Sequence, residues 1–185
     1  TGFIEKPGWG QVTTDAANTG IYIVSPEVLS YIPENTKYDF AQDLFPLLLR
    51  EGLPLYAYET QAYWCDIGDL HTYVECQRDI LEGRVDGTEV SDQTVIRGAR
   101  PQGEYTLIPP VYIGKDVHIG TAAQIGPFAV LDDGCHVGSN AKVRGSVLLE
   151  SSYVGDRVSM TGTLLCHGSS VRKGASLFEG AVIGE

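Results

Sequence analysis

Two charged side chains stand next to each other near the start of the chain, in the run F-I-E-K-P-G. Glu5 and Lys6 precede Pro7, which stiffens the backbone that follows. An adjacent carboxylate and ammonium can hold a polyol and a phosphate together, because the first accepts hydrogen bonds and the second binds anions. Glu–Lys pairs are also common on protein surfaces, so this pair taken alone favours a solvated position.

Two small polar residues stand before the next apolar run. Asn18 and Thr19 precede Gly20 and the apolar residues 21–24. An asparagine amide can donate to and accept from a sugar hydroxyl. Asparagine at a corner is also a common turn former, and both roles remain open for Asn18.

The run A-Y-W-C-D-I-G-D, residues 62–69, carries a carboxylate inside an apolar stretch. Asp66 follows Tyr63 and Trp64, and Asp69 ends the run. Asp66 could cap the next helix, although Asp69 is the better-placed cap. Alternatively, Asp66 is held at the end of a strand, where a rigid carboxylate could take part in chemistry.

The elements expected around these residues alternate between strands and helices. Apolar runs at 21–24, 54–59 and 62–68 predict strands. Helices are expected from Pro26 to about residue 32, from Asp39 through Pro46 to Gly52, and from Asp69 to about Glu82. The order β, α, α, β, β, α indicates an α/β unit over residues 1–83.

A six-residue repeat fills the chain from residue 111 onward. An aliphatic residue stands at the third place of seven consecutive repeats, and the register slips by one residue at Val154 and again at Leu165. The aliphatic positions are Ile113, Ile119, Ile125, Leu131, Val137, Val143 and Leu149. A turn every six residues predicts a parallel β-helix of triangular coils over 111–185, in which each coil buries its neighbour's face. Residues 84–110 are expected to form the linker and cap.

The amino-acid composition limits which kinds of partner the protein can bind and in which compartment it is expected. The net charge of −11 and scattered lysines and arginines argue against a nucleic-acid partner. No apolar run is long enough to span a membrane. The cysteines form no CxxC pair, so we expect free, buried or half-buried thiols and a reducing, cytoplasmic compartment. These cysteines are Cys65, Cys76, Cys135 and Cys166.

The ordered set of E-K-P, N-T-G-I-Y-I, D-L-F-P-L-L-L, A-Y-W-C-D-I-G-D and hexapeptide repeats resembles the sugar-1-phosphate nucleotidyltransferases. The sequence is most similar to mannose-1-phosphate guanylyltransferases that carry a β-helix. The resemblance covers nearly the whole chain. It implies the sugar-binding half of a Rossmann-like nucleotidyltransferase domain followed by a left-handed parallel β-helix.

The resemblance also implies roles for five residues. Glu5 would bind sugar hydroxyls, Lys6 the phosphate of the sugar 1-phosphate, and Asn18 with its neighbour Thr19 the sugar. Asp66, in the W-x-D-x-G run, would bind a catalytic Mg²⁺. Lys6 and Asp66 would then be the catalytic residues, and the substrates would be a nucleoside triphosphate and a hexose 1-phosphate, with GTP and mannose 1-phosphate favoured.

Part of the family pattern is missing. The G-G-x-G-T-R-L loop that binds the triphosphate is absent, as is the segment that would supply a second magnesium aspartate. We therefore expect the chain to be a piece of a longer protein that is inactive alone and forms homo-oligomers through its β-helix.

Three alternatives remain open at this point. The first is a glucose-1-phosphate nucleotidyltransferase. The second is a non-catalytic regulatory or assembly subunit of the same architecture. The third is a hexapeptide acyltransferase that would use one of His118, His136 and His167.

Overall fold

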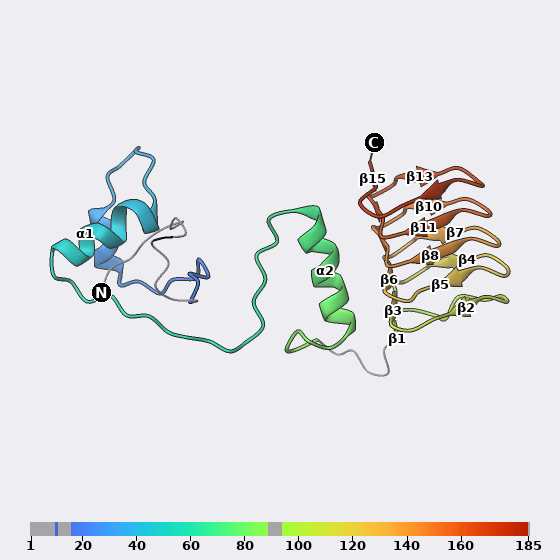
Figure 1. Ribbon diagram of the computed structural model, residues 1–185, viewed down its shortest axis with the longest axis horizontal. Helices are drawn as coiled ribbons and strands as arrows, with labels where there is room; N and C mark the ends of the chain where they lie inside the picture. Colours follow the sequence, from blue (N-terminus) through green and yellow to red (C-terminus); the bar gives the residue numbers. More distant parts are fainter. Residues whose placement is uncertain (1–9, 11–15, 89–93, 185) are drawn as a thin grey trace. The chain divides into compact units, whose positions relative to one another are not determined.

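The computed structural model describes residue 10, residues 16–88 and residues 94–184, which fall into two compact units. The first unit ends at Ala62 and the second begins at Tyr63 (Figure 1). Within the described residues, no helix is long and apolar enough to cross a membrane.

Short helices form the ordered centre of the first unit. They are a 3₁₀-helix η2 (Pro26–Tyr31), a single π-helical turn η3 (Phe40–Leu44) and helix α1 (Phe45–Arg50). The Asp39 carboxylate accepts two backbone N–H groups at the start of η3, as the sequence predicts. Pro46 lies in the first turn of α1, where its missing N–H costs no helical hydrogen bond.

A small apolar cluster holds these helices together. Leu44, Phe45 and Leu48 are buried. The Tyr22 ring stacks on Phe40 at 5.6 Å between centroids and meets Phe45 edge to face at 4.9 Å. Residue 22 is thereby fixed to the helices although it belongs to no strand.

The strands expected at 21–24, 54–59 and 62–68 are wrong. In the described part of the chain, the first strand begins at Thr94. Ile23 is 102% exposed and Tyr58 is 91% exposed. A strand needs the backbone groups of a neighbour, and the described residues offer these apolar segments no such neighbour.

The second unit opens with residues 63–69 and helix α2 (Leu70–Leu81). The Asp69 carboxylate accepts the Thr72 N–H at 2.7 Å, which confirms Asp69, not Asp66, as the helix cap. Leu81 at the end of α2 is buried.

Residues 94–184 form a parallel β-helix with three faces (Figure 1). Every pairing between its strands is parallel. The first face is the sheet β1 (Thr94–Ile96), β3 (Val111–Ile113), β6 (Ala129–Leu131), β9 (Val147–Leu148), β12 (Leu164–Leu165), β15 (Val182–Ile183). The second face is β4 (His118–Ile119), β7 (His136–Val137), β10 (Tyr153–Val154), β13 (Ser170–Val171). The third face is β2 (Thr106–Leu107), β5 (Gln124–Ile125), β8 (Lys142–Arg144), β11 (Ser159–Thr161), β14 (Ser176–Leu177).

The predicted repeat is confirmed, with one shift in its register. Leu131 pairs with Leu148, and Leu148 is fully buried, whereas Leu149 is only half-buried. The sequence analysis placed Leu149 in the core and the first slip at Val154. Instead, the repeat that ends at Leu148 is one residue shorter than the regular repeat. Val154 then follows Leu148 at the regular spacing.

Both shortened corners carry a buried hydroxyl. Ser146 and Thr163 have no exposed surface, and each precedes a strand of the first face. The Ser146 hydroxyl donates to the Arg144 carbonyl at 2.8 Å and accepts the Thr163 N–H at 3.1 Å. The second of these bonds gives the buried Thr163 N–H a partner inside the protein.

Two strands lie within residues 84–110, the segment expected to be linker and cap. β1 pairs with β3, and β2 pairs with β5, so both belong to the first coil. Ile96 and Leu107 pack against the core of the β-helix. This part of the segment therefore closes the start of the β-helix.

Candidate functional site

Asp66 lies in a stretch that is neither helical nor turned. Its side chain is exposed, and within the described ranges its carboxylate has no hydrogen bond or ion pair. The Asp66 carbonyl accepts the Gly68 N–H at 2.9 Å, which fixes the backbone next to the carboxylate. The carboxylate is thus open to a ligand or metal.

A tyrosine fastens this stretch to α2. The Tyr63 hydroxyl donates to the Asp79 carboxylate at 2.6 Å, and Arg84 forms an ion pair with the same carboxylate. The hydrogen bond from Tyr63 and the charge of Arg84 lower the pKa of Asp79, and the carboxylate of Asp79 raises the pKa of Tyr63. Asp66 is therefore three residues from one anchor, Tyr63, and three from another, the Asp69 cap.

Sequence reasoning missed this anchor and placed both aromatics in a strand over residues 62–68. Trp64 is 43% exposed and does not lie in a core. Only Tyr63 is half-buried, and a hydrogen bond rather than strand pairing holds it. The sequence carries no motif for this anchor, because Tyr63 and Asp79 are sixteen residues apart.

Asn18 forms a local turn in the first unit. Its side-chain oxygen accepts the Gly20 N–H at 3.1 Å, and its amide nitrogen donates to the Tyr22 hydroxyl at 2.7 Å. This geometry supports the turn-forming alternative, and a role in sugar binding stays a prediction. Thr19 beside it is half-buried. Glu5 and Lys6 lie outside the described residues.

The predicted site residues that the structure describes fall in different units. Asn18 and Thr19 belong to the first unit and Asp66 to the second. Among the described residues, no three His, Cys, Asp or Glu side chains gather as a metal cluster. An exposed, unpaired carboxylate nevertheless fits Mg²⁺, which often takes one or two protein carboxylates and completes its octahedron with phosphate oxygens and water.

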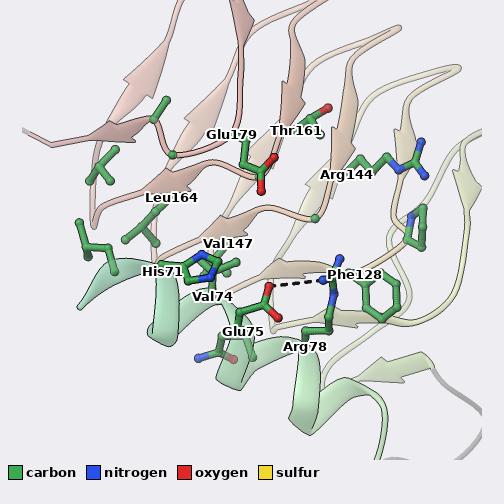
Figure 2. Close-up of a pocket in the computed structure, with 18 residues that line it drawn as sticks. His71, Val74, Glu75, Arg78, Phe128, Arg144, Val147, Thr161, Leu164 and Glu179 are labelled. Carbon is green, nitrogen blue, oxygen red and sulfur yellow. Dashed lines mark hydrogen bonds and ion pairs between the residues drawn. The ribbon is translucent and has the colours of Figure 1, made fainter. Parts of the chain in front are cut away.

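The second unit contains a cavity of about 460 Å³ between α2 and the β-helix. Figure 2 shows His71, Val74, Glu75 and Arg78 from α2 facing Val147 and Leu164 of the first face. The cavity is lined by mostly apolar walls with a few charged side chains, a composition common to small-molecule sites.

One pair of contacts fixes the charged edge of this cavity. The Arg78 guanidinium lies 4.6 Å from the centroid of the Phe128 ring and bonds Glu75 at 3.3 Å. Arg144 and Glu179 also line the cavity, from two coils of the β-helix that the coil of Thr161 separates (Figure 2).

An apolar column on the outside of the first face explains why α2 lies there. The column consists of residues whose side chains point away from the β-helix core, one from each strand of this face. They are Val95, Tyr112, Val130, Val147, Leu164 and Val182. Val147 is 2% exposed and Leu164 is 5% exposed, although neither belongs to the inner core. Sequence reasoning followed only the inward positions and missed this column.

The corresponding column of the second face is aromatic. The His118 and His136 rings stack at 4.5 Å between centroids, and Tyr153 stacks on His136 at 4.9 Å. Burial, together with the nearby charge of His118, lowers the pKa of His136. In the described residues neither histidine has a carboxylate hydrogen-bonded to it, whereas the exposed His167 lies 3.8 Å from the Glu150 carboxylate.

Comparison with family models divides the chain in two. Residues 1–83 match the Nucleotidyl transferase family, and residues 107–185 match the GMPPB C-terminal domain.

Curated relatives carry the names of sugar-1-phosphate nucleotidyltransferases. UTP–glucose-1-phosphate uridylyltransferase of Synechocystis sp. is 33% identical over 160 residues, covering 83% of this chain and 41% of the relative. Glucose-1-phosphate adenylyltransferase of Clostridium perfringens is 29% identical over 159 residues, covering 83% and 36%. Mannose-1-phosphate guanylyltransferase of Mycobacterium tuberculosis is 28% identical over 146 residues, covering 78% and 35%. The chain thus spans about two fifths of the length of these relatives.

Proposed function

We propose that this chain supplies the sugar-side half of an enzyme that makes a nucleoside diphosphate sugar. The reason is that the chain belongs to the sugar-1-phosphate nucleotidyltransferases. In this reaction a phosphate oxygen of a hexose 1-phosphate attacks the α-phosphorus of a nucleoside triphosphate. A new phosphorus–oxygen bond forms as the bond to pyrophosphate breaks. Both reactants are anions, so catalysis requires positioning and charge neutralisation more than a nucleophilic side chain.

The observation that carries the proposal is the state of Asp66. Its carboxylate is exposed and unpaired among the described residues, yet anchors on both sides restrain the backbone around it. A structural aspartate would be expected to cap a helix or pair with a base, and Asp69 and Asp79 already fill those roles.

The remaining site residues have complementary tasks. Asp66 would hold Mg²⁺, which, when bound, neutralises charge on the phosphates. Lys6 would lower the repulsion between the two anionic substrates. Glu5, Asn18 and Thr19 would bind sugar hydroxyls, and Asn18 would exchange its present turn hydrogen bonds for bonds to the sugar.

GTP and mannose 1-phosphate are the favoured substrates. The match of residues 107–185 to the GMPPB C-terminal domain and the guanylyltransferase relative support them. Glucose 1-phosphate is the second candidate, since the uridylyltransferase relative reaches 33% identity.

The nucleotide-binding half would pair with the extended segments of the first unit. Ile21 is 75% exposed, Ile23 is 102% exposed and Tyr56 is 90% exposed, all on segments with strand-like sequence and no strand partner. The sequence also lacks the glycine-rich triphosphate loop. The chain alone would therefore not turn over.

The β-helix would serve as a platform for homo-oligomers. In the described chain, β13, β14 and β15 each end a sheet and leave one edge unpaired. Such edges favour association unless they are covered. We place the assembled enzyme in a reducing, cytoplasmic compartment, and the absence of a disulfide among the four cysteines supports this.

Pyrophosphate release tests the proposal. The chain would be expressed with the upstream part of its own reading frame and assayed in magnesium with the common nucleoside triphosphates, each against mannose and glucose 1-phosphates. We expect turnover with one preferred pair and a loss of about 100-fold or more in Asp66→Ala. Asp86→Ala, which removes another exposed carboxylate, is the matched control and should retain activity.

Two outcomes would contradict the proposal. Turnover by the present chain alone would show that no further half is needed. No turnover with any substrate pair in the extended protein would favour a regulatory or assembly subunit, and Asp66 would then be a structural residue.

A further inference from the structure

We propose that Phe128 of the β-helix is a positioning residue for Asp66, and that it acts through Arg78 and Asp79 of helix α2. The effect on turnover rests on the proposed function, because the position of Asp66 matters for the reaction only if its carboxylate binds a metal. The physical link between the β-helix and the segment that carries Asp66 does not depend on that function.

Phe128 stands at a corner of the β-helix where its backbone is unfavourable. Its φ is +57°, in the left-handed region that a bulky aromatic residue rarely adopts. The same corner is glycine with positive φ in the three coils that follow, at Gly145, Gly162 and Gly180. A ring therefore replaces glycine at a strained corner, and such strain points to a role beyond the fold of the coil.

The Phe128 ring receives a cation from α2. The Arg78 guanidinium lies 4.6 Å from the centroid of the ring, within the range of a cation–π contact. Glu75, three residues earlier on the helix, bonds the guanidinium at 3.3 Å and helps to hold it in place (Figure 2). A glycine at this corner would offer Arg78 no ring, so Phe128 supplies a contact that the next three coils lack.

The next residue of α2 holds the segment that carries Asp66. Asp79 follows Arg78 directly, and its carboxylate accepts the Tyr63 hydroxyl at 2.6 Å. The other end of the segment is held at the start of α2, which the Asp69 carboxylate caps. Asp66 lies midway between these two attachments, so its position follows that of α2.

Two consecutive residues of one helical turn thus connect the β-helix to the segment. Arg78 and Asp79 point about 100° apart around the helix axis, so each can reach a different neighbour. Hydrogen bonds between successive turns make the helix stiff over this distance. A shift of Arg78 on the β-helix therefore moves Asp79, and Tyr63 moves with it.

Apolar packing also holds α2, but it fixes the helix less exactly. Val74 of α2 faces Val147 and Leu164, which are buried although they lie on the outside of the first face (Figure 2). Such packing is non-directional and allows small rotations of the helix. The contact at Phe128 is directional, so its loss should leave α2 attached but less precisely placed.

Amide hydrogen exchange followed by NMR tests the link on this chain. Phe128→Gly installs the residue that the next three coils use, so the coil should fold normally. We expect the Gly68 amide, which donates to the Asp66 carbonyl, and the amides of α2 to exchange about 3- to 10-fold faster. Amides in residues 131–171 should be unchanged.

Ala122→Gly is the matched control for the change in the backbone. Ala122 also has a positive φ, +59°, at an exposed corner of the β-helix, and it does not line the cavity beside α2. This variant relieves the same kind of strain without touching the link. Exchange of Gly68 and α2 should therefore match that of the unmodified chain.

The Mg²⁺ requirement of the extended protein is the second readout, because a role confined to the fold would not move it. Phe128→Gly should raise the Mg²⁺ concentration for half-maximal pyrophosphate release about 3- to 10-fold. Phe128→Tyr keeps the ring and should retain the original requirement. Arg78→Met should raise it as much as Phe128→Gly does, and the double variant should raise it no further, because the two residues make one contact.

Three results would overturn the proposal. They are unchanged exchange of Gly68 and α2 in Phe128→Gly, faster exchange spread over the whole β-helix, and an unchanged Mg²⁺ requirement in an active extended protein. Faster exchange confined to Gly68 and α2, in an extended protein that never turns over, supports the link and contradicts only the proposed function.

Discussion

The β-helix and the first unit contain similar strand-like sequences but end in different structures. In the β-helix, short segments form parallel strands with the segments of neighbouring coils, as His118–Ile119 does with His136–Val137. The aliphatic side chains of these strands are buried. In the first unit, residues 21–24 are extended and Ile23 is completely exposed.

The difference lies in where the partner strand comes from. Each coil of the β-helix meets a similar segment in the next coil, so the repeat supplies both strands. Segments 21–24 and 54–59 carry the composition of strands without a repeat that provides a neighbour. Strand-like composition therefore becomes a strand only where the same chain or another chain offers a free edge.

Replacing a core leucine of the β-helix should produce the largest effect. Leu148→Ala removes a fully buried side chain from the column containing Leu131 and Leu165, and we expect a loss of about 2–5 kcal/mol in the free energy of unfolding. Leu149→Ala, the neighbouring half-buried residue, should cost about 1 kcal/mol. Urea unfolding followed by circular dichroism measures both. A larger loss in the Leu149 variant would show that Leu149 is the core residue, as the sequence analysis predicted.

Replacing a glycine at a corner of the β-helix should have the second-largest effect on the free energy of unfolding. A Cβ at Gly120 would lie 2.5 Å from the Ser139 backbone nitrogen, so the next coil must move in Gly120→Ala, at a cost of about 1–3 kcal/mol. Gly174 has φ of +75° but open space around it, and Gly174→Ala should cost about 1 kcal/mol through backbone strain alone. Thermal unfolding compares the two, and equal losses would argue against close coil stacking as the reason for Gly120.

The histidine column should make the β-helix sensitive to acid. The pKa of His136 lies below its ordinary value because of burial and the His118 charge, while Asp156 opposes this in part. The unfolded protein therefore takes up a proton first as the pH falls, so stability is full above the ordinary histidine pKa and declines below it. In His136→Gln, the midpoint of thermal unfolding should change less between about pH 8 and pH 5 than in the unmodified protein. An unchanged slope would assign the effect to other groups.

A substitution in the extended segment of the first unit should have the smallest effect on the free energy of unfolding. Ile23→Ala removes a fully exposed side chain and should change the free energy of unfolding of this chain by less than about 0.5 kcal/mol. Leu44→Ala, in the buried cluster of the same unit, is the control and should be clearly destabilising. If Ile23→Ala destabilises the chain equally, residues 21–24 already have a partner here.

The sequence predicted the β-helix closely because its signal is periodic and local. The step before Leu148 was misplaced, since Leu148 and Leu149 are both leucine and composition cannot distinguish them. The first coil, with strands β1 and β2, lies before residue 111, where the repeat begins in the sequence. The caps at Asp39 and Asp69 were also predictable, because a cap depends on groups within one turn.

The candidate site was predicted less well from the residues alone. The anchor between Tyr63 and Asp79 joins positions sixteen residues apart and has no fixed motif. The strand expected around Asp66 depended on a neighbour that the described chain does not provide. The roles of Glu5, Lys6, Asn18, Thr19 and Asp66 came from resemblance and remain predictions.

Hydrogen–deuterium exchange on this chain tests the central contrast most directly. We predict strong protection of backbone amides in residues 111–171 and fast exchange in residues 16–24 and 53–62, because only the β-helix provides strand partners. Protection of the extended segments comparable to that of the β-helix would contradict the account, since it would mean that these segments pair without a nucleotide-binding half.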